Sequence, residues 1–387
     1  MSVEERRARL AARHFLSSPA GGVEEVAKRL VAYHSTDPTT VYLSALARIP
    51  GFQRSDLDAA LYDRKSLVRV VGMRRTLWVV PRDEVPAVHN SSTRSLIAAE
   101  RKRTARMVEE GGIASDGNEW LHHAEKRTIA ALRARGEAVA TDLTKDVPEL
   151  AEKITFYKKD GSVLGTVGMV TRILFLLATE GKAVRARPKG TWVSGLYRWA
   201  PMEAWLGTPI ESIDAVTARA SLLDRWLLAF GPGTETDIGW WTGWTKTHMR
   251  AALESIGAIP VEVDGGPAWI SAADEDGDPS RPRFVRLLPS LDPTTMGWKQ
   301  REWYLGEHEA SLFDRNGNAG PTVWVDGRIV GAWAVRKSGE IAWELVESVP
   351  AARIAEIEIE AVRLGEWLEG TVVSPRFASP LHNAIRG

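Results

Sequence analysis

The sequence predicts an α+β protein in which three similar units, each formed by helices and closed by a β-hairpin, precede a strand-rich C-terminal domain. Two observations support this class. The order of helices followed by a hairpin occurs near the N-terminus and recurs twice further along the chain. The last third of the chain is instead rich in strand patterns. With 387 residues the chain exceeds what one hydrophobic core usually serves, and we expect domains at residues 1–95, 96–210, 211–275 and 283–387.

The first unit begins with four predicted helices. Apolar residues recur at helical spacing in VEERRARLAARHFL and in VEEVAKRLVAYH, which predicts the first two. A third helix follows Asp37, and a fourth starts with Ser55 as its cap. The run LVRVVGMRRTLWVV then alternates like a tight hairpin. Three helices followed by a two-stranded hairpin are the layout of a winged helix, in which the hairpin is the wing.

The second and third units repeat this order. In the second, the helical run MVTRILFLLATEGKAVRA leads into AVRARPKGTWVSGLYRWAP, which has the length and turn residues of another wing. In the third, three predicted helices precede a hairpin around Asp264, Gly265 and Gly266.

The C-terminal domain is predicted as an antiparallel meander. A polar segment at residues 274–283 has the composition of a solvated linker. Strand patterns follow in FVRLLPSL, in GPTVWVDGRIVGAWAVRKSGEIAWELV and in GTVVSP, while AARIAEIEIEAVRLGEWL is helical.

Composition excludes several classes of protein. The chain has no cysteine, which removes disulfides, thiolate zinc sites and cysteine nucleophiles. It has no apolar run of the roughly 18 residues that span a bilayer, so we expect a cytoplasmic protein without membrane contact. No glycine-rich phosphate loop is present, and His34 with Asp37 lacks a third metal ligand nearby. We therefore expect neither a cofactor nor a metal.

Basic residues indicate DNA binding even though the total charge is balanced. Fifty basic side chains match fifty acidic ones, so any binding must come from local patches. One patch lies at the second wing, which holds Arg187, and another at the last helix of the third unit, which begins with Lys246. A winged helix contacts the phosphate backbone at these places.

The stretch YHSTDPTT in the first unit has two interpretations. Asp37 before a proline is typical of a helix cap, and His34 at the end of the preceding helix would be a cation against a helix C-terminus. Alternatively, the imidazole, the hydroxyls and the carboxylate are catalytic groups of an active site. Spacing alone leaves both open.

A family resemblance bears on this choice. The runs YHSTDPTTVYLSALARIPGF, LVRVVGMRRTLWVVP, RWLLAFGPGTETDIGWWTG and LLPSLDP with TVWVDGRIVGAW together resemble the winged-helix family that contains the AlkZ and YcaQ DNA glycosylases. The resemblance extends over residues 23–373. It implies three tandem winged helices held by a C-terminal β domain, and excision of N7-alkylated guanines, including bulky adducts and interstrand crosslinks. Some members protect the organism that makes the alkylating toxin.

The catalytic motif of that family is glutamine, an apolar residue, then glutamine or aspartate. Here His34, Ser35 and Thr36 match its three positions and Asp37 the aspartate that follows. Every motif position departs from the usual residue type. The departure implies either an altered specificity or a loss of catalysis.

The resemblance assigns roles that fit the chemistry of an N7-alkylated guanine. This base is already cationic, so its departure needs little acid assistance and leaves an oxocarbenium-like sugar that requires stabilisation and a positioned water. Neutral His34, with a free pKa near ~6.5, would hold or deprotonate the water. Thr36 would orient the water, and Asp37 would stabilise the sugar cation. Further predicted DNA contacts are Arg74, Arg75, Trp298, Lys299 and Arg301, with a core position as the alternative for Trp298.

We therefore predict a monomeric, cofactor-free, monofunctional DNA glycosylase that acts on bulky N7-alkylguanine in double-stranded DNA. The short Thr36 side chain leaves a wider pocket, which favours a bulky adduct. The alternatives are a winged-helix DNA-binding or regulatory protein without catalysis, and a protein-interaction scaffold that binds DNA weakly.

Overall fold

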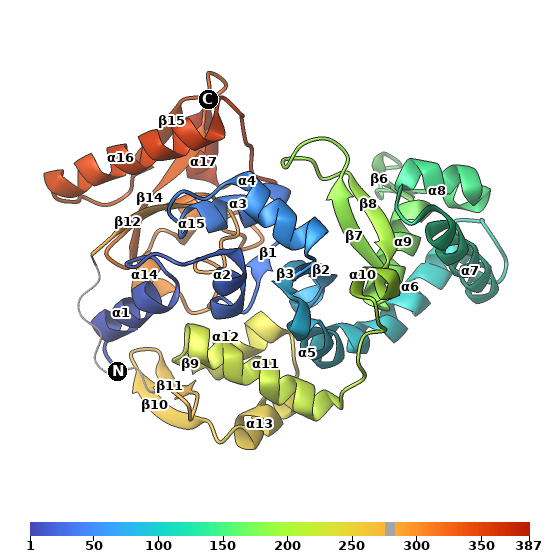
Figure 1. Ribbon diagram of the computed structural model, residues 1–387, viewed down its shortest axis with the longest axis horizontal. Helices are drawn as coiled ribbons and strands as arrows, with labels where there is room; N and C mark the ends of the chain where they lie inside the picture. The colour runs from blue at the N-terminus through green and yellow to red at the C-terminus, as the bar shows by residue number, and fades with distance from the viewer. Residues whose placement is uncertain (275–282) are drawn as a thin grey trace.

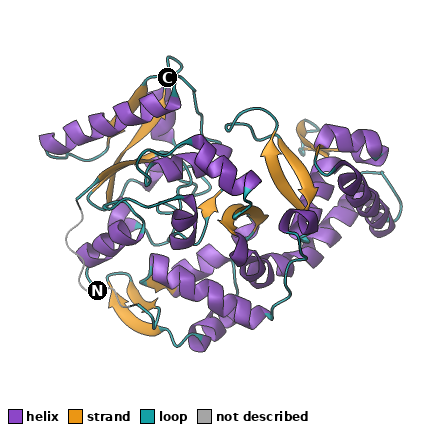
Figure 2. Cartoon of the chain, in the orientation of Figure 1, coloured by secondary structure: helices purple, strands orange, loops and turns teal. Residues whose placement is uncertain are grey.

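A computed structural model describes residues 1–274 and 283–387 of the chain (Figure 1). It confirms the mixed α+β class, with several small antiparallel sheets distributed among helices (Figure 2). Within the described residues, no helix combines the length and the apolar character that crossing a membrane requires.

The first unit has a short strand that precedes its hairpin in the chain. Its sheet has the order β1-β3-β2, so β1 pairs with the second hairpin strand. The N-terminal helix α1 (Val3–Arg13) lies outside this unit and packs on the third. The elements of the unit are α2 (Val23–Arg29), β1 (Tyr33–His34), α3 (Pro38–Leu46), α4 (Arg54–Asp58), β2 (Leu67–Val71), β3 (Leu77–Pro81) and the connecting α5 (Val85–Val88).

The second unit repeats this order with one insertion. Its sheet has the order β4-β8-β7. The inserted hairpin β5–β6 was not predicted, although Asp160 and Gly161 supply its turn. The elements are α6 (Ile97–Glu110), α7 (Gly117–Arg135), β4 (Ala138–Val139), α8 (Ala140–Asp146), β5 (Lys153–Tyr157), β6 (Val163–Gly168), α9 (Met169–Thr179), β7 (Ala183–Pro188), β8 (Tyr197–Pro201) and α10 (Met202–Leu206).

The third unit has the same order again, with the sheet β10-β11-β9. In each unit a helix, a short strand and two further helices precede a hairpin, and the short strand pairs with the second strand of that hairpin. This is the element order expected of a winged helix. The elements are α11 (Ala215–Phe230), β9 (Gly233–Thr234), α12 (Glu235–Thr242), α13 (Lys246–Ser255), β10 (Ile259–Val263) and β11 (Gly266–Ile270).

The C-terminal region contains a four-stranded meander, as predicted, with the order β12-β13-β14-β15. The predicted strand GTVVSP is wrong, because residues 371–375 have no regular structure. Most of the predicted linker, residues 275–282, lies outside the described residues. The elements are β12 (Val285–Leu288), α14 (Glu302–Leu305), α15 (Glu309–Leu312), β13 (Thr322–Val325), β14 (Arg328–Val335), β15 (Ile341–Leu345), α16 (Ala351–Leu368) and α17 (Pro380–Arg386).

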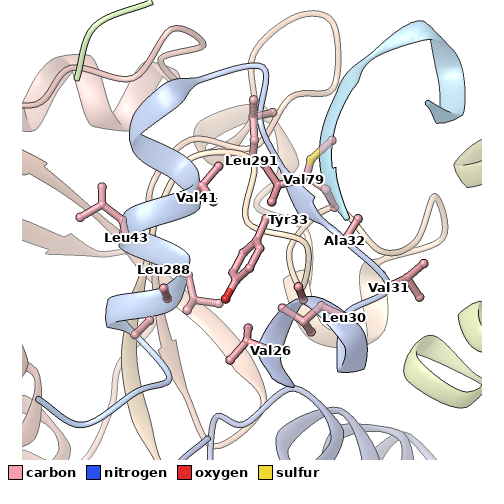
Figure 3. Close-up of a cluster of buried hydrophobic side chains, with 14 of the residues drawn as sticks. Val26, Leu30, Val31, Ala32, Tyr33, Val41, Leu43, Val79, Leu288 and Leu291 are labelled. Carbon is pink, nitrogen blue, oxygen red and sulfur yellow. The ribbon is translucent and has the colours of Figure 1, made fainter. Parts of the chain in front are cut away.

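The first unit lies in the middle of the molecule, between the other two units and the C-terminal meander (Figure 1). Its core is continuous with that of the C-terminal domain: the Tyr33 ring packs among apolar side chains of α2 and α3 and against Leu288 and Leu291 (Figure 3). The Tyr33 hydroxyl donates to the Val23 carbonyl at 3.1 Å, which satisfies the one polar atom of this ring. Burial of Tyr33 therefore anchors β1 from one face.

Candidate active site

The stretch that carries His34 is an extended segment rather than a helix end. The prediction that His34 ends a helix is wrong, because α2 ends at Arg29 and His34 lies in β1. Strand β1 pairs with β3 so that His34 lies opposite Trp78, and the Ser35 amide donates to the Leu77 carbonyl at 2.8 Å. Side chains alternate along an extended strand, so His34 lies on the face opposite Tyr33.

His34 is buried and electrically neutral. Its side chain meets the Trp78 ring edge to face, with ring centroids 4.7 Å apart, and only 3% of the residue is exposed. Burial, together with the positive charge of Arg74, lowers the pKa of His34 to about 3. An imidazole with that pKa is a weak base at neutral pH, so the sequence-based assumption of a value near ~6.5 does not hold. The neutral His34 imidazole can still donate or accept a hydrogen bond.

Two polar atoms of this stretch have no partner. His34 Nδ1 and Thr36 Oγ1 are both buried without a hydrogen-bond partner among the described residues. An unpaired buried polar atom costs free energy, so such atoms are expected to hold water or substrate. Thr36 lies two residues after His34, in the bend that follows β1.

Asp37 makes full use of its carboxylate within the protein. Oδ1 accepts from the Thr39 amide at 2.9 Å and from the Thr39 hydroxyl at 2.7 Å, which confirms Asp37 as the cap of α3. Oδ2 accepts from the Arg376 amide at 2.8 Å. Asp37 thereby ties the start of α3 to the C-terminal segment.

Helix α3 is fixed to the C-terminal domain by a buried ion pair. The Arg48 guanidinium donates to both carboxylate oxygens of Asp292, at 2.9 and 2.7 Å, and both side chains are fully buried. The Ser44 hydroxyl also donates to Asp292, and the Thr40 hydroxyl donates to the Ser290 carbonyl. The segment LLPSLDP therefore supports the helix that follows the motif.

Arg69 supports the other side of the motif, a role that no local sequence pattern indicates. Its Nε donates to the Ser35 hydroxyl at 2.9 Å, and its guanidinium lies over the Tyr197 ring at 4.6 Å. Tyr197 belongs to the second wing, so Arg69 connects the motif to that unit.

Arg74 and Arg301 meet at one tryptophan. The Arg74 guanidinium lies 3.9 Å from the centroid of the half-buried Trp240 ring, and the Arg301 guanidinium lies 5.3 Å from the same ring. Arg301 also lies over Phe313 at 4.4 Å. Among the described residues, neither arginine forms an ion pair with a carboxylate. Both were predicted DNA contacts, whereas Trp240 was not.

Two other predicted DNA contacts are engaged within the protein. Arg75 forms an ion pair with Glu100 at 2.8 Å, which connects the first hairpin to α6. Arg187 forms ion pairs with Asp58 at 3.1 Å and with Asp63 at 3.0 Å. These contacts favour roles between the units for both arginines.

The remaining predicted contacts divide by exposure. Lys246 and Lys299 are exposed and can meet a ligand at the surface. Trp298 is 2% exposed, its indole nitrogen donates to the Phe230 carbonyl, and its ring packs edge to face on Phe230 at 5.3 Å. This position favours the alternative that Trp298 is a core residue.

A cavity of about 620 Å³ lies away from the motif. It is lined by residues of α7, the end of α9, α10 and the segment around His89, and no motif residue lines it. Within the described residues, no cluster of three or more His, Asp or Glu side chains has the geometry to hold a metal ion.

Comparison with known proteins gives two matches. The family model described as DNA glycosylase AlkZ-like matches residues 27–367. The fold is similar to a solved structure of Streptomyces sahachiroi DNA glycosylase AlkZ, with a TM-score of 0.73 and 18% sequence identity over 96% of this chain and 97% of that one. No curated protein sequence matches the chain. At 18% identity the structural likeness concerns the fold alone.

Proposed function

The chain belongs to the AlkZ-like DNA glycosylase family, and on that premise we propose that it excises bulky N7-alkylated guanine from double-stranded DNA. The proposed reaction is monofunctional hydrolysis. The bond between C1′ and N9 breaks and the alkylated base departs as a neutral purine. Water adds to C1′ and releases one proton to the solvent, which leaves an abasic site. DNA is the partner, and a single copy of the chain carries all the residues that the proposal uses.

One observation carries the proposal: His34 Nδ1 and Thr36 Oγ1 are buried without partners at the positions that match the family's catalytic motif. Two such atoms, two residues apart in the chain, can hold one bridging water between them. His34 keeps its imidazole neutral because its pKa is about 3, so it positions the water without competing for a proton.

A strong base is not needed for this substrate. The N7-alkylated guanine is a cation before the bond breaks, so electrostatic stabilisation of the sugar and a placed water supply most of the required help. We assign Asp37 the role of a positioning residue, because the Thr39 and Arg376 donors engage both of its oxygens. Its negative charge still lies beside the motif and favours a cationic sugar.

Two features support the finer assignments. The motif offers an imidazole and hydroxyls but no amine, whereas glycosylases that also cut the strand through a Schiff base need an amine nucleophile. Thr36 is shorter than the glutamine or aspartate at its position, which leaves room for a bulky adduct. Protection against a DNA-alkylating natural product is the use that we propose for such an enzyme.

The test is a single-turnover assay on duplexes that carry one N7-alkylguanine, with adducts of increasing bulk. We expect abasic sites from the wild type, and a loss of roughly 100-fold for His34→Ala, because a displaced nucleophile costs about that much. His123→Ala, which alters an exposed histidine on α7, is the matched control and should retain the wild-type rate. Wild-type rates for both His34→Ala and Thr36→Ala at unchanged DNA affinity would overturn the assignment.

A second candidate function rests on a different observation. His34 is almost fully buried and the Asp37 oxygens are engaged, which favours a DNA-binding or regulatory protein without turnover. Such a protein would leave alkylated duplex intact. It would instead prefer one undamaged sequence by a factor of ~1000 or more over random DNA.

A further inference from the structure

The junction of the first hairpin, α12 and the C-terminal domain holds two arginines that have no ion-pair partner in the described part of the chain. Arg74 comes from the turn between β2 and β3, Arg301 precedes α14, and both guanidinium groups lie over the Trp240 ring of α12. Arg301 is 1% exposed, whereas Arg74 and Trp240 are half-buried. The cluster is thus closed on one side and reaches solvent on the other.

Hydrogen bonding within the cluster is incomplete. Arg74 Nε and Arg301 Nη1 are buried and have no partner among the described residues. Arg301 Nε donates a long hydrogen bond to the Lys299 carbonyl, at 3.5 Å. An arginine has five N–H donors in a rigid fork, so several donors here are available to a ligand.

The positive charges of Arg74 and Arg301 repel each other at this junction. Burial lowers the pKa of Arg74 to about 10, and the positive charge of Arg301 acts in the same direction. The buried Arg48, in contrast, is paired with the Asp292 carboxylate. A pair of arginines without one is an unfavourable arrangement that an anion would relieve.

The backbone of the turn between β2 and β3 is also conformationally strained. Arg74 and Arg75 have φ of 52° and 64°, in the left-handed region that favours glycine. Gly243, which ends α12, lies against Arg74: a Cβ placed on it would approach the Arg74 nitrogen to 3.6 Å. A strained turn whose side chain is aimed by its surroundings is characteristic of ligand clamps.

We propose that Arg74 and Arg301, held together by Trp240, form a binding site for one phosphate group of the DNA strand that carries the lesion. The planar guanidinium fork matches the geometry of a phosphate, and the exposed side of Trp240 is the way in. Arg74 also acts on His34 through its charge, so the bound phosphate lies close to the motif. That the ligand is the lesion-bearing DNA strand rests on the proposed function. The existence of an anion site does not depend on it.

The first test uses inorganic phosphate and needs no DNA. At a concentration roughly tenfold above its Kd, phosphate should raise the Tm of the wild type by about 2 °C over sodium chloride of equal ionic strength. Arg74→Gln and Arg301→Gln should each lose this response, and Arg74→Lys should keep only part of it. The matched control is Arg75→Gln, because Arg75 lies in the same turn but is already paired with Glu100. It should respond as the wild type does.

The second test separates DNA from a free anion. With an undamaged duplex, Arg74→Gln should reduce the slope of log Kobs against log salt by about 0.9, which corresponds to one phosphate contact. A phosphate response with an unchanged salt slope would mean that the site takes a free anion, and would overturn the assignment to DNA. No phosphate response in the wild type would overturn the site itself. Neither readout depends on base excision, so a failure of the glycosylase proposal is detected separately.

Discussion

Removing one partner of the buried Arg48–Asp292 pair should destabilise the protein strongly. Asp292 accepts two bonds from Arg48, one from the Ser44 hydroxyl and one from the Thr294 amide, and no part of its side chain is exposed. In Asp292→Ala the Arg48 charge stays buried without a carboxylate. Loss of one partner of such a pair costs about 3–5 kcal/mol.

The pH dependence of this pair has a defined sign. Although burial raises the pKa of Asp292, the charge of Arg48 and the accepted hydrogen bonds outweigh that effect and lower the pKa. The carboxylate therefore contributes its full stability above the unfolded value of about 3.9, and this contribution is lost as the pH falls through the folded pKa. The difference in the free energy of unfolding between the wild type and Asp292→Ala should become smaller only in strong acid.

The assay is urea unfolding at pH 7.5, followed by tryptophan fluorescence. Glu110→Ala is the matched control, because Arg106–Glu110 is also an arginine–carboxylate pair but has side chains 74% and 69% exposed. Exposed pairs contribute about 0–1 kcal/mol. A loss of less than about 1 kcal/mol in Asp292→Ala, equal to the control, would refute the view that this pair fixes α3 to the C-terminal domain.

Three further predictions concern pH, the core and the second wing. His14 and His34 are buried with pKa values of about 3, so both remain neutral in the folded protein while the unfolded chain takes up protons below pH ~6.5. The free energy of unfolding should therefore fall by up to about 2 kcal/mol per histidine between pH ~6.5 and pH ~5, as measured by urea unfolding at both pH values. In His34→Gln this fall should be smaller by the contribution of His34. Trp298→Ala should cost about 3–5 kcal/mol and leave the salt dependence of DNA binding unchanged, whereas a stable variant with weaker binding would make Trp298 a DNA contact. Arg187→Ala should change the free energy of unfolding by less than about 1 kcal/mol, because its two ion pairs are partly exposed. A change in the salt dependence of DNA binding in this variant would instead identify Arg187 as a DNA contact.

Much of the architecture could be predicted because it depends on local patterns. Amphipathic helices, hairpin turns and the Asp37 cap are encoded within a few neighbouring residues. Strand β1 was missed because it has two residues and exists only through pairing with β3. The α17 helix carries a Ser379 cap and Pro380 as start signals, so the prediction overlooked information that was present.

The site was less predictable because its properties depend on contacts distant in sequence. No local pattern indicates that Arg75 meets Glu100 while Arg74, one residue earlier, meets no carboxylate of the described chain. Burial of His34 likewise depends on Trp78, which reaches it through a strand pairing. The sequence therefore indicates a group of basic residues but not which of them have a partner within the protein.

The central claim is that His34 and Thr36 hold one water for attack on the sugar, and a double-mutant cycle tests it most directly. Single-turnover excision of a bulky N7-alkylguanine is measured for wild type, His34→Ala, Thr36→Ala and the double variant. If both side chains act on the same water, the double variant should be little slower than the slower single variant, with a coupling energy of about 1 kcal/mol or more. Multiplicative losses in the double variant, or excision that is unaffected by either change, would contradict the account.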